Sequence, residues 1–167
     1  MTIADFDHLD RESKKKLLYQ CCGSSAWVDK MLAAPPAEDL IDLFEDAEER
    51  WYSLTEDDWK EAFSNHPKIG DVESLRKKFA SDQFASGEQS GVVNASDQTL
   101  QALAEGNKIY EEKFGYIFIV HAAGKSAVEM LGILTARLQN KPATEIANAM
   151  DEQSKITRFR LEKLFES

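Results

Sequence analysis

The stretch around which the chain is organised is Asn65-His66-Pro67-Lys68-Ile69-Gly70-Asp71. Pro67 disfavours helical dihedral angles at the residue before it, so a helix that approaches this stretch must end at or before His66. Gly70 allows a backbone turn that other residues resist, and Asp71 can cap the next helix through its side-chain oxygen. The stretch therefore predicts a histidine held on a stiff corner between two helices.

A histidine in such a place is a candidate acid/base, because its unperturbed pKa lies near neutrality. The alternative is that His66 only fills a turn. The corner alone does not distinguish an acid/base role of His66 from a turn-filling role, so the evidence must come from the rest of the chain.

Composition limits the classes of function. A chain of 167 residues, 43% hydrophobic and 30% charged, is typical of globular proteins, and we expect one domain over residues 1–167. The net charge of −10 argues against nucleic acid and anionic membranes as partners. An anionic substrate needs a local basic group, because the overall field repels it.

The remaining bulk features predict a cytoplasmic protein without a metal site. Cys21 and Cys22 are adjacent, and neighbouring cysteines do not form the usual structural disulfide. The chain has no CxxC pair and no HExxH, so we expect no metal site. Neither a secretory signal nor an apolar run of membrane-spanning length is visible.

Apolar spacing and capping residues predict about eight helices. The clearest stripe has steps of three and four residues and consists of Leu40, Leu43, Phe44, Ala47 and Trp51. Predicted starts are Asp10, Ser24 or Ser25, Pro36, Thr55, Asp71, Ser96, Ser126 and Thr144; predicted stops include Gly23, Pro35, Gly115 and Pro142. Residues 81–91 are rich in Ser, Gly and Asp and predict a loop.

Residues 116–122, Tyr-Ile-Phe-Ile-Val-His-Ala, have the composition of a buried strand. No partner strand is visible elsewhere. We therefore expect an extended buried segment with some backbone N–H groups available to a ligand. The predicted fold class is an all-α, single-domain multi-helix bundle with this one extended apolar segment.

Three further polar features each allow two interpretations, a structural one and a functional one. Arg160 lies beside the apolar stripe of the last helix, where it either covers the core with its stem or holds a substrate carboxylate. Glu88-Gln89 are either solvated loop residues or groups that orient a histidine and bind an amide. His121 is either a satisfied core histidine or a ligand-facing residue.

Several ordered pieces of the chain resemble one known family, 2-oxo-4-hydroxy-4-carboxy-5-ureidoimidazoline (OHCU) decarboxylase, an enzyme of urate degradation. The pieces that carry the resemblance are Cys21-Cys22-Gly23-Ser24 with Trp27 and Met31, His66-Pro67-Lys68-Ile69-Gly70, Glu88-Gln89, Lys113-Phe114-Gly115-Tyr116 through Gly124-Lys125-Ser126, Arg137-Leu138-Gln139-Asn140, and Arg160-Leu161.

The resemblance implies a cofactor-free carbon–carbon lyase, often a homodimer, that converts a small ureidoimidazoline to (S)-allantoin. It implies catalytic roles for His66 and Glu88. The residues that it implies in substrate binding are Pro67, Ala85, Gln89, Phe118, Ile119, Val120, His121, Ala122 and Arg160.

Two positions depart from the family pattern. Ala85 stands where a serine is expected, although Ser86 is adjacent, and His121 replaces what is commonly a smaller residue. These departures leave open a related enzyme that acts on a different ureido or imidazoline compound. A third possibility is a non-catalytic helical interaction module that binds a basic partner through the acidic face of residues 38–49.

Overall fold

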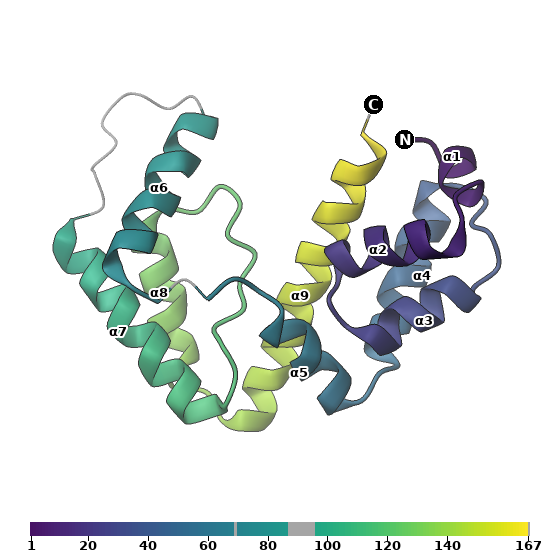
Figure 1. Ribbon diagram of the computed structural model, residues 1–167. Coiled ribbons are helices and arrows are strands. Elements are labelled where there is room, and N and C mark those ends of the chain that lie inside the picture. Colours follow the sequence, from purple (N-terminus) through teal and green to yellow (C-terminus); the bar gives the residue numbers. More distant parts are fainter. Residues whose placement is uncertain (69, 87–95, 167) are drawn as a thin grey trace. The chain divides into compact units, whose positions relative to one another are not determined.

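The computed structural model describes residues 1–68, 70–86 and 96–166, and in these residues it contains nine α-helices and no strand (Figure 1). The all-α prediction is confirmed, and the extra helix is a short one at the N-terminus. By contacts the chain divides into two compact units, Met1–His66 with Asn148–Ser167, and Pro67–Ala147. The expectation of one domain stays a prediction.

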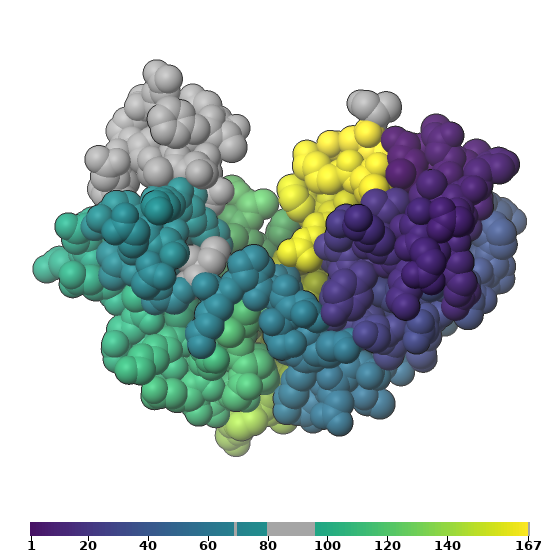
Figure 2. All heavy atoms as spheres, viewed as in Figure 1, coloured from purple at the N-terminus to yellow at the C-terminus, as the bar shows by residue number. Residues whose placement is uncertain are grey.

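The first unit contains the N-terminal helices and most of the last helix. Its helices are α1 (Ile3–Asp7), α2 (Arg11–Cys21), α3 (Ser25–Ala33), α4 (Leu40–Tyr52), α5 (Glu56–Ser64) and the part of α9 (Pro142–Phe165) that follows Ala147. Two buried indoles join them, since Trp27 Nε1 donates to Ala47 O at 3.0 Å and Trp51 Nε1 donates to Met150 O at 3.0 Å. In Figure 2 the end of α9 lies against the N-terminal residues, and the Phe6 and Phe165 rings meet edge to face at 5.8 Å.

The second unit contains α6 (Val72–Ser86), α7 (Asp97–Phe114), α8 (Ala127–Arg137), the non-helical segment 116–122 and the start of α9. Helices α7 and α8 pack side by side (Figure 1). Tyr110 of α7 is fully buried and forms the centre of this core, where its ring contacts those of Phe114, Tyr116 and Phe118.

Most of the predicted boundaries are confirmed by caps in the structure. The side chains of Asp10, Ser24, Thr55, Ser96 and Ser126 each accept a hydrogen bond from the backbone of the helix that follows them. Asp71 accepts from Ser74 N at 2.8 Å. Gly115 ends α7 with φ at 83°, in the left-handed region that favours glycine.

Three boundary predictions are wrong. The fourth helix begins at Leu40 with Asp39 as its cap, rather than at Pro36. The last helix begins at Pro142, so Thr144 lies inside it. Helix α6 continues to Ser86 through part of the predicted loop 81–91, whose remainder lies outside the described residues.

No helix of the described residues is long and apolar enough to cross a membrane.

Candidate active site

The corner that carries His66 is fixed by its neighbour in the sequence. Helix α5 ends at Ser64, and the Asn65 side-chain amide donates to Gly23 O at 2.7 Å and to Tyr19 Oη at 2.9 Å. A Cβ on Gly23 would lie 2.7 Å from Asn65 Cβ, so only glycine permits this approach. The corner is thereby joined to the end of α2.

The His66 imidazole reaches the last helix. Its Nε2 forms a short hydrogen bond with Gln153 Oε1, and Gln153 Nε2 donates to Thr157 Oγ1 at 3.1 Å. Gln153 is 0% exposed and Thr157 is 5% exposed, whereas His66 is half-buried. One turn of α9 therefore supplies a row of buried polar groups behind an imidazole that keeps partial access to solvent.

Arg160 lies on the same side of α9, seven residues after Gln153. Its Nη1 donates to Cys21 O at 3.3 Å and to Gln20 O at 3.4 Å. These are carbonyls of the last turn of α2, where a cation is favoured by the helix dipole. The guanidinium is thus held in place at one edge and is half-buried.

Electrostatics keep His66 neutral. Burial is the largest effect and lowers the pKa of His66 below its ordinary 6.5, because the imidazolium loses hydration. The hydrogen bond with Gln153 acts in the opposite direction, and the charge of Arg160 lowers the pKa further. The neutral imidazole can accept a proton at pH 7, as a general base requires.

The two cysteines do not form a nucleophile with His66. Burial raises the pKa of Cys21 to about 11 and that of Cys22 to about 12, so both stay protonated at neutral pH. Both thiols are free and buried, which agrees with a packing role.

In the second unit, segment 116–122 is non-helical and partly buried, as predicted. Protein donors take three of its carbonyl oxygens: Arg137 Nη1 binds Ile119 O at 2.6 Å, Lys125 Nζ binds His121 O at 2.8 Å, and Lys125 N binds Ala122 O at 3.0 Å. In a trans peptide the N–H points opposite to the carbonyl. Arg137 therefore directs the N–H of Val120 away from the buried network.

Arg137 is itself held by a buried carboxylate. Its Nε and Nη2 lie 2.6 Å and 2.5 Å from Glu145 Oε1, and its guanidinium carbon lies 4.7 Å from the centre of the Phe118 ring. Glu145 also accepts from Tyr110 Oη at 2.6 Å and from Asn140 Nδ2 at 3.0 Å. Arg137 is 7% exposed and Glu145 is 0% exposed, so this pair is a core feature.

The predicted site residues are divided between the two units. His66 and Arg160 belong to the first unit, while Pro67 and the residues Phe118 to Ala122 belong to the second. Ala85 lies near the end of α6. Glu88 and Gln89 lie outside the described residues.

Three polar residues close to these groups were not predicted: Gln153, Thr157 and Glu145. Their only signal in the sequence is a polar side chain on the apolar stripe of the last helix, with Gln153, Thr157 and Arg160 spaced by four and three residues.

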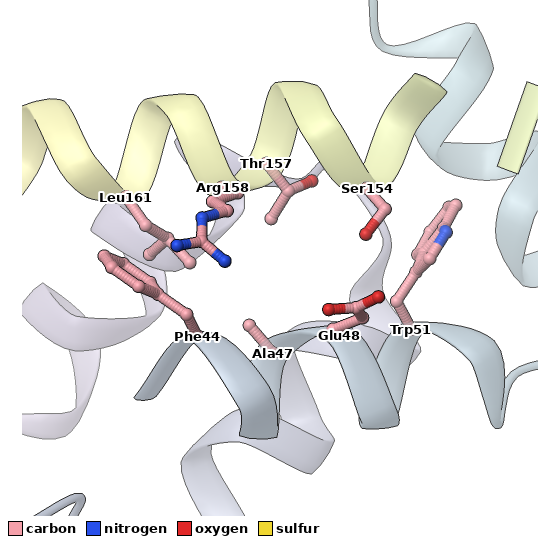
Figure 3. Close-up of a pocket in the computed structure, with 8 residues that line it drawn as sticks. All are labelled: Phe44, Ala47, Glu48, Trp51, Ser154, Thr157, Arg158 and Leu161. Carbon is pink, nitrogen blue, oxygen red and sulfur yellow. The ribbon is translucent and has the colours of Figure 1, made fainter. Parts of the chain in front are cut away.

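A small cavity lies between α4 and α9 and shares Thr157 with the row of polar groups behind His66 (Figure 3). It is lined by Phe44, Ala47, Glu48, Trp51, Ser154, Thr157, Arg158 and Leu161. Its volume of about 20 Å³ is enough for roughly one water molecule and too small for a substrate. Neither His66 nor Arg160 lines it. Among the described residues, no cluster of three or more His, Cys, Asp or Glu side chains could hold a metal ion.

Comparison with known proteins links this chain to one family. The model of the OHCU decarboxylase family matches residues 7–162. A crystal structure of OHCU decarboxylase in the presence of (S)-allantoin is 34% identical in sequence, with a TM-score of 0.72, and the match covers 95% of this chain and all of that one.

Similar proteins occur in distant organisms. The uric acid degradation bifunctional protein TTL of Arabidopsis thaliana is 38% identical over 148 residues, which are 87% of this chain and 45% of that protein. PucL of Bacillus subtilis (strain 168), another bifunctional protein, is 24% identical over 161 residues, 96% of this chain and 32% of its own length. The chain thus spans less than half the length of each of these two relatives. The decarboxylase of Halalkalicoccus jeotgali is 23% identical over 165 residues, 98% of this chain and 92% of that protein.

Proposed function

Since the chain belongs to the OHCU decarboxylase family, we propose that it is a carboxy-lyase that converts OHCU to (S)-allantoin in urate degradation. The observation that carries the proposal is the family match across residues 7–162. A second line of support is His66, which is neutral, half-buried and held on a rigid corner.

The reaction breaks the bond between a ring carbon and its carboxylate, and carbon dioxide leaves. The bonding electron pair stays behind and is delocalised into the adjacent carbonyl or imine. A proton then completes the product, and its delivery from one face sets the handedness. Side chains that move protons and donors that neutralise the transient charge suffice for these steps.

We assign proton transfer to His66, as acceptor of the substrate hydroxyl proton or as donor to the product carbon. A positioned acid/base of this kind is typically worth about 10²–10⁴-fold in rate. Arg160 holds a carbonyl or charged part of the substrate. A tight ion pair with the departing carboxylate would stabilise the ground state, so its role is orientation.

The remaining assignments rest on residue chemistry. The peptide N–H groups of residues 118–122, of which that of Val120 is oriented by Arg137, stabilise the transient anion in the manner of an oxyanion hole. Glu88 orients the imidazole or accepts from ureido nitrogens, and Gln89 binds the same amide group. Pro67, Ala85 and His121 complete the lining. We also propose that the protein is a homodimer, which light scattering of the purified protein tests. We further propose that it is located in the cytoplasm.

The test generates the unstable substrate in the cuvette. Urate is oxidised by a urate oxidase and hydrolysed by a hydroxyisourate hydrolase, and circular dichroism then follows chiral allantoin after addition of this protein. We expect a rapid signal of one sign. His66→Ala should abolish it, and His8→Ala, the same change at an exposed N-terminal position, should not.

A slow racemic background with folded wild-type protein would refute the proposal. It would favour the alternative of a different ureidoimidazoline substrate, with Ala85 and His121 as the first positions to examine. Loss of activity in both histidine variants would refute the specific assignment of His66.

A further inference from the structure

We propose that Gln153 is a positioning residue for His66: its amide oxygen accepts the Nε2 proton, so neutral His66 presents Nδ1 as its basic atom. The inference deepens the proposed function and rests on it for its catalytic meaning. Its structural content concerns only residues of the first unit.

The Gln153 amide has a defined direction. A carboxamide offers one accepting oxygen and a donating NH₂ group. Gln153 Nε2 donates to Thr157 Oγ1 at 3.1 Å, so Gln153 Oε1 is the atom that faces the imidazole. An accepting oxygen at that position requires a proton on His66 Nε2.

The Thr157 hydroxyl is the acceptor in this arrangement. Its oxygen accepts from Gln153 Nε2 at 3.1 Å. A hydroxyl has two acceptor lone pairs, so accepting from the amide leaves its own proton available for another partner. Thr157 also acts on the buried Cys22 thiol and lowers the pKa of that thiol against the larger effect of burial. Protons therefore run from His66 to Gln153 and from Gln153 to Thr157.

Burial makes the loss of a hydrogen bond in this row costly. With Gln153 at 0% and Thr157 at 5% exposure, solvent does not replace a lost partner, and an unsatisfied buried polar group costs about 1–3 kcal/mol. Reversal of the amide would require the other tautomer of His66 and a Thr157 hydroxyl that donates to Gln153 instead of accepting from it. The orientation of the amide in the structure therefore corresponds to the tautomer of His66 that is protonated on Nε2.

The charge around the ring agrees with this assignment. Arg160 on α9 is the cation that acts on His66, and it disfavours a second proton on the imidazole. The two thiols at the end of α2 stay neutral. A neutral imidazole with Nε2 protonated has one lone pair, on Nδ1, and this is the atom that can take a proton from the substrate.

The competing explanation is that Gln153 is merely a satisfied core amide. The two explanations differ in what the imidazole does when the amide is changed. Replacement by methionine preserves length and removes the acceptor, while replacement by glutamate keeps an acceptor and adds charge. If the role of Gln153 is purely structural, His66 should have the same tautomer in both variants as in the wild type.

The experiment is two-bond ¹H–¹⁵N NMR of protein labelled at its three histidines, with His66→Gln used to assign the His66 signals. Wild type should show His66 protonated on Nε2. Gln153→Met should show both tautomers, and its kcat should fall about 10- to 100-fold, a part of the full acid/base contribution. Gln153→Glu should keep Nε2 protonated, raise the pKa of His66 and move the acid limb of the pH–rate profile to higher pH. Lys155→Met, an exposed change on the same helix, should alter none of these.

Protonation of wild-type His66 on Nδ1 would overturn the inference, and so would a Gln153→Met spectrum and pH profile identical to wild type. If Gln153→Met fails to fold, the wild-type and Gln153→Glu spectra still decide it. The spectra need no substrate, so a protein without decarboxylase activity that shows the predicted tautomer would refute the proposed function alone.

Discussion

Removal of the Arg137 guanidinium should destabilise the protein through the carboxylate that it leaves behind. In Arg137→Met the hydrophobic stem is kept, but Glu145, at 0% exposure, loses its cation and Ile119 O loses a charged donor. Breaking a buried ion pair by removing one partner typically costs about 3–5 kcal/mol. For a chain of this size each kcal/mol lowers Tm by about 2–4 °C, so Tm should fall by about 6–20 °C.

The pH dependence of this loss identifies its cause. In wild type, burial raises the pKa of Glu145, but hydrogen bonds from Arg137, Tyr110 and Asn140 outweigh it and hold the pKa below the ordinary 4.5. Its contribution to stability is therefore present above pH 4.5 and lost as the pH falls through the folded-state pKa. Without Arg137, burial should raise the pKa of Glu145 above 4.5, so the folded variant binds a proton more readily than its unfolded state and gains stability between pH 7 and pH 5.

The assay is urea unfolding followed by circular dichroism at pH 7 and pH 5. The control is Arg76→Met, the same substitution in the same unit, at an Arg76–Asp97 pair whose side chains are 53% and 74% exposed. Exposed pairs contribute about 0–1 kcal/mol, so the control should change little. A second variant, Arg137→Met with Glu145→Gln, should be less destabilised than Arg137→Met alone, because no buried charge remains. A cost below about 1 kcal/mol, or one that does not shrink at pH 5, would refute this reasoning.

Three other predictions concern the first unit. Arg160→Met should lower kcat/KM by about tenfold or more if it orients substrate, as measured with freshly generated OHCU, while Arg158→Met on the opposite side of α9 should not; equal kinetics in both would remove Arg160 from the site. Because the pKa of His66 is lowered in the folded state, stability should fall as the pH drops below 6.5, and His66→Gln should reduce that slope in urea titrations at pH 5 and 7. Iodoacetamide at pH 8 should leave Cys21 and Cys22 unmodified in the folded protein and modify both in urea, as mass spectrometry can show; rapid labelling of either thiol without urea would contradict its burial.

The helices could be predicted from the sequence wherever a local rule acts alone. Asp10, Thr55 and Ser126 cap their helices as expected, because the side chain of a cap satisfies backbone N–H groups a few residues away in the chain. Gly115 ends its helix for an equally local reason, the freedom of glycine at positive φ.

The boundary predictions failed where two local signals competed. Pro36 and Asp39 are both acceptable starts for the fourth helix, and the aspartate cap prevails, with its side chain 2.9 Å from Asp42 N. At the last helix the outcome is reversed, since Pro142 starts it and Thr144 becomes an interior residue. Local rules give both possibilities, and packing of the rest of the chain chooses between them.

The groups that support the site could not be found by spacing, because they are defined by contacts between distant parts of the chain. His66 and Gln153 are 87 residues apart, and Arg137 reaches Ile119 across 18 residues. A buried glutamine on an apolar helix face is the single visible sign of the first contact, and in the sequence it is indistinguishable from an exposed polar residue at the edge of the stripe. Motifs identify the candidate reacting groups. The buried amide and the buried ion pair are determined by the requirement that every polar group in the core has a partner. That requirement acts only once the fold exists, which is why the orientation of the imidazole and of the Ile119–Val120 peptide could be inferred from the structure alone.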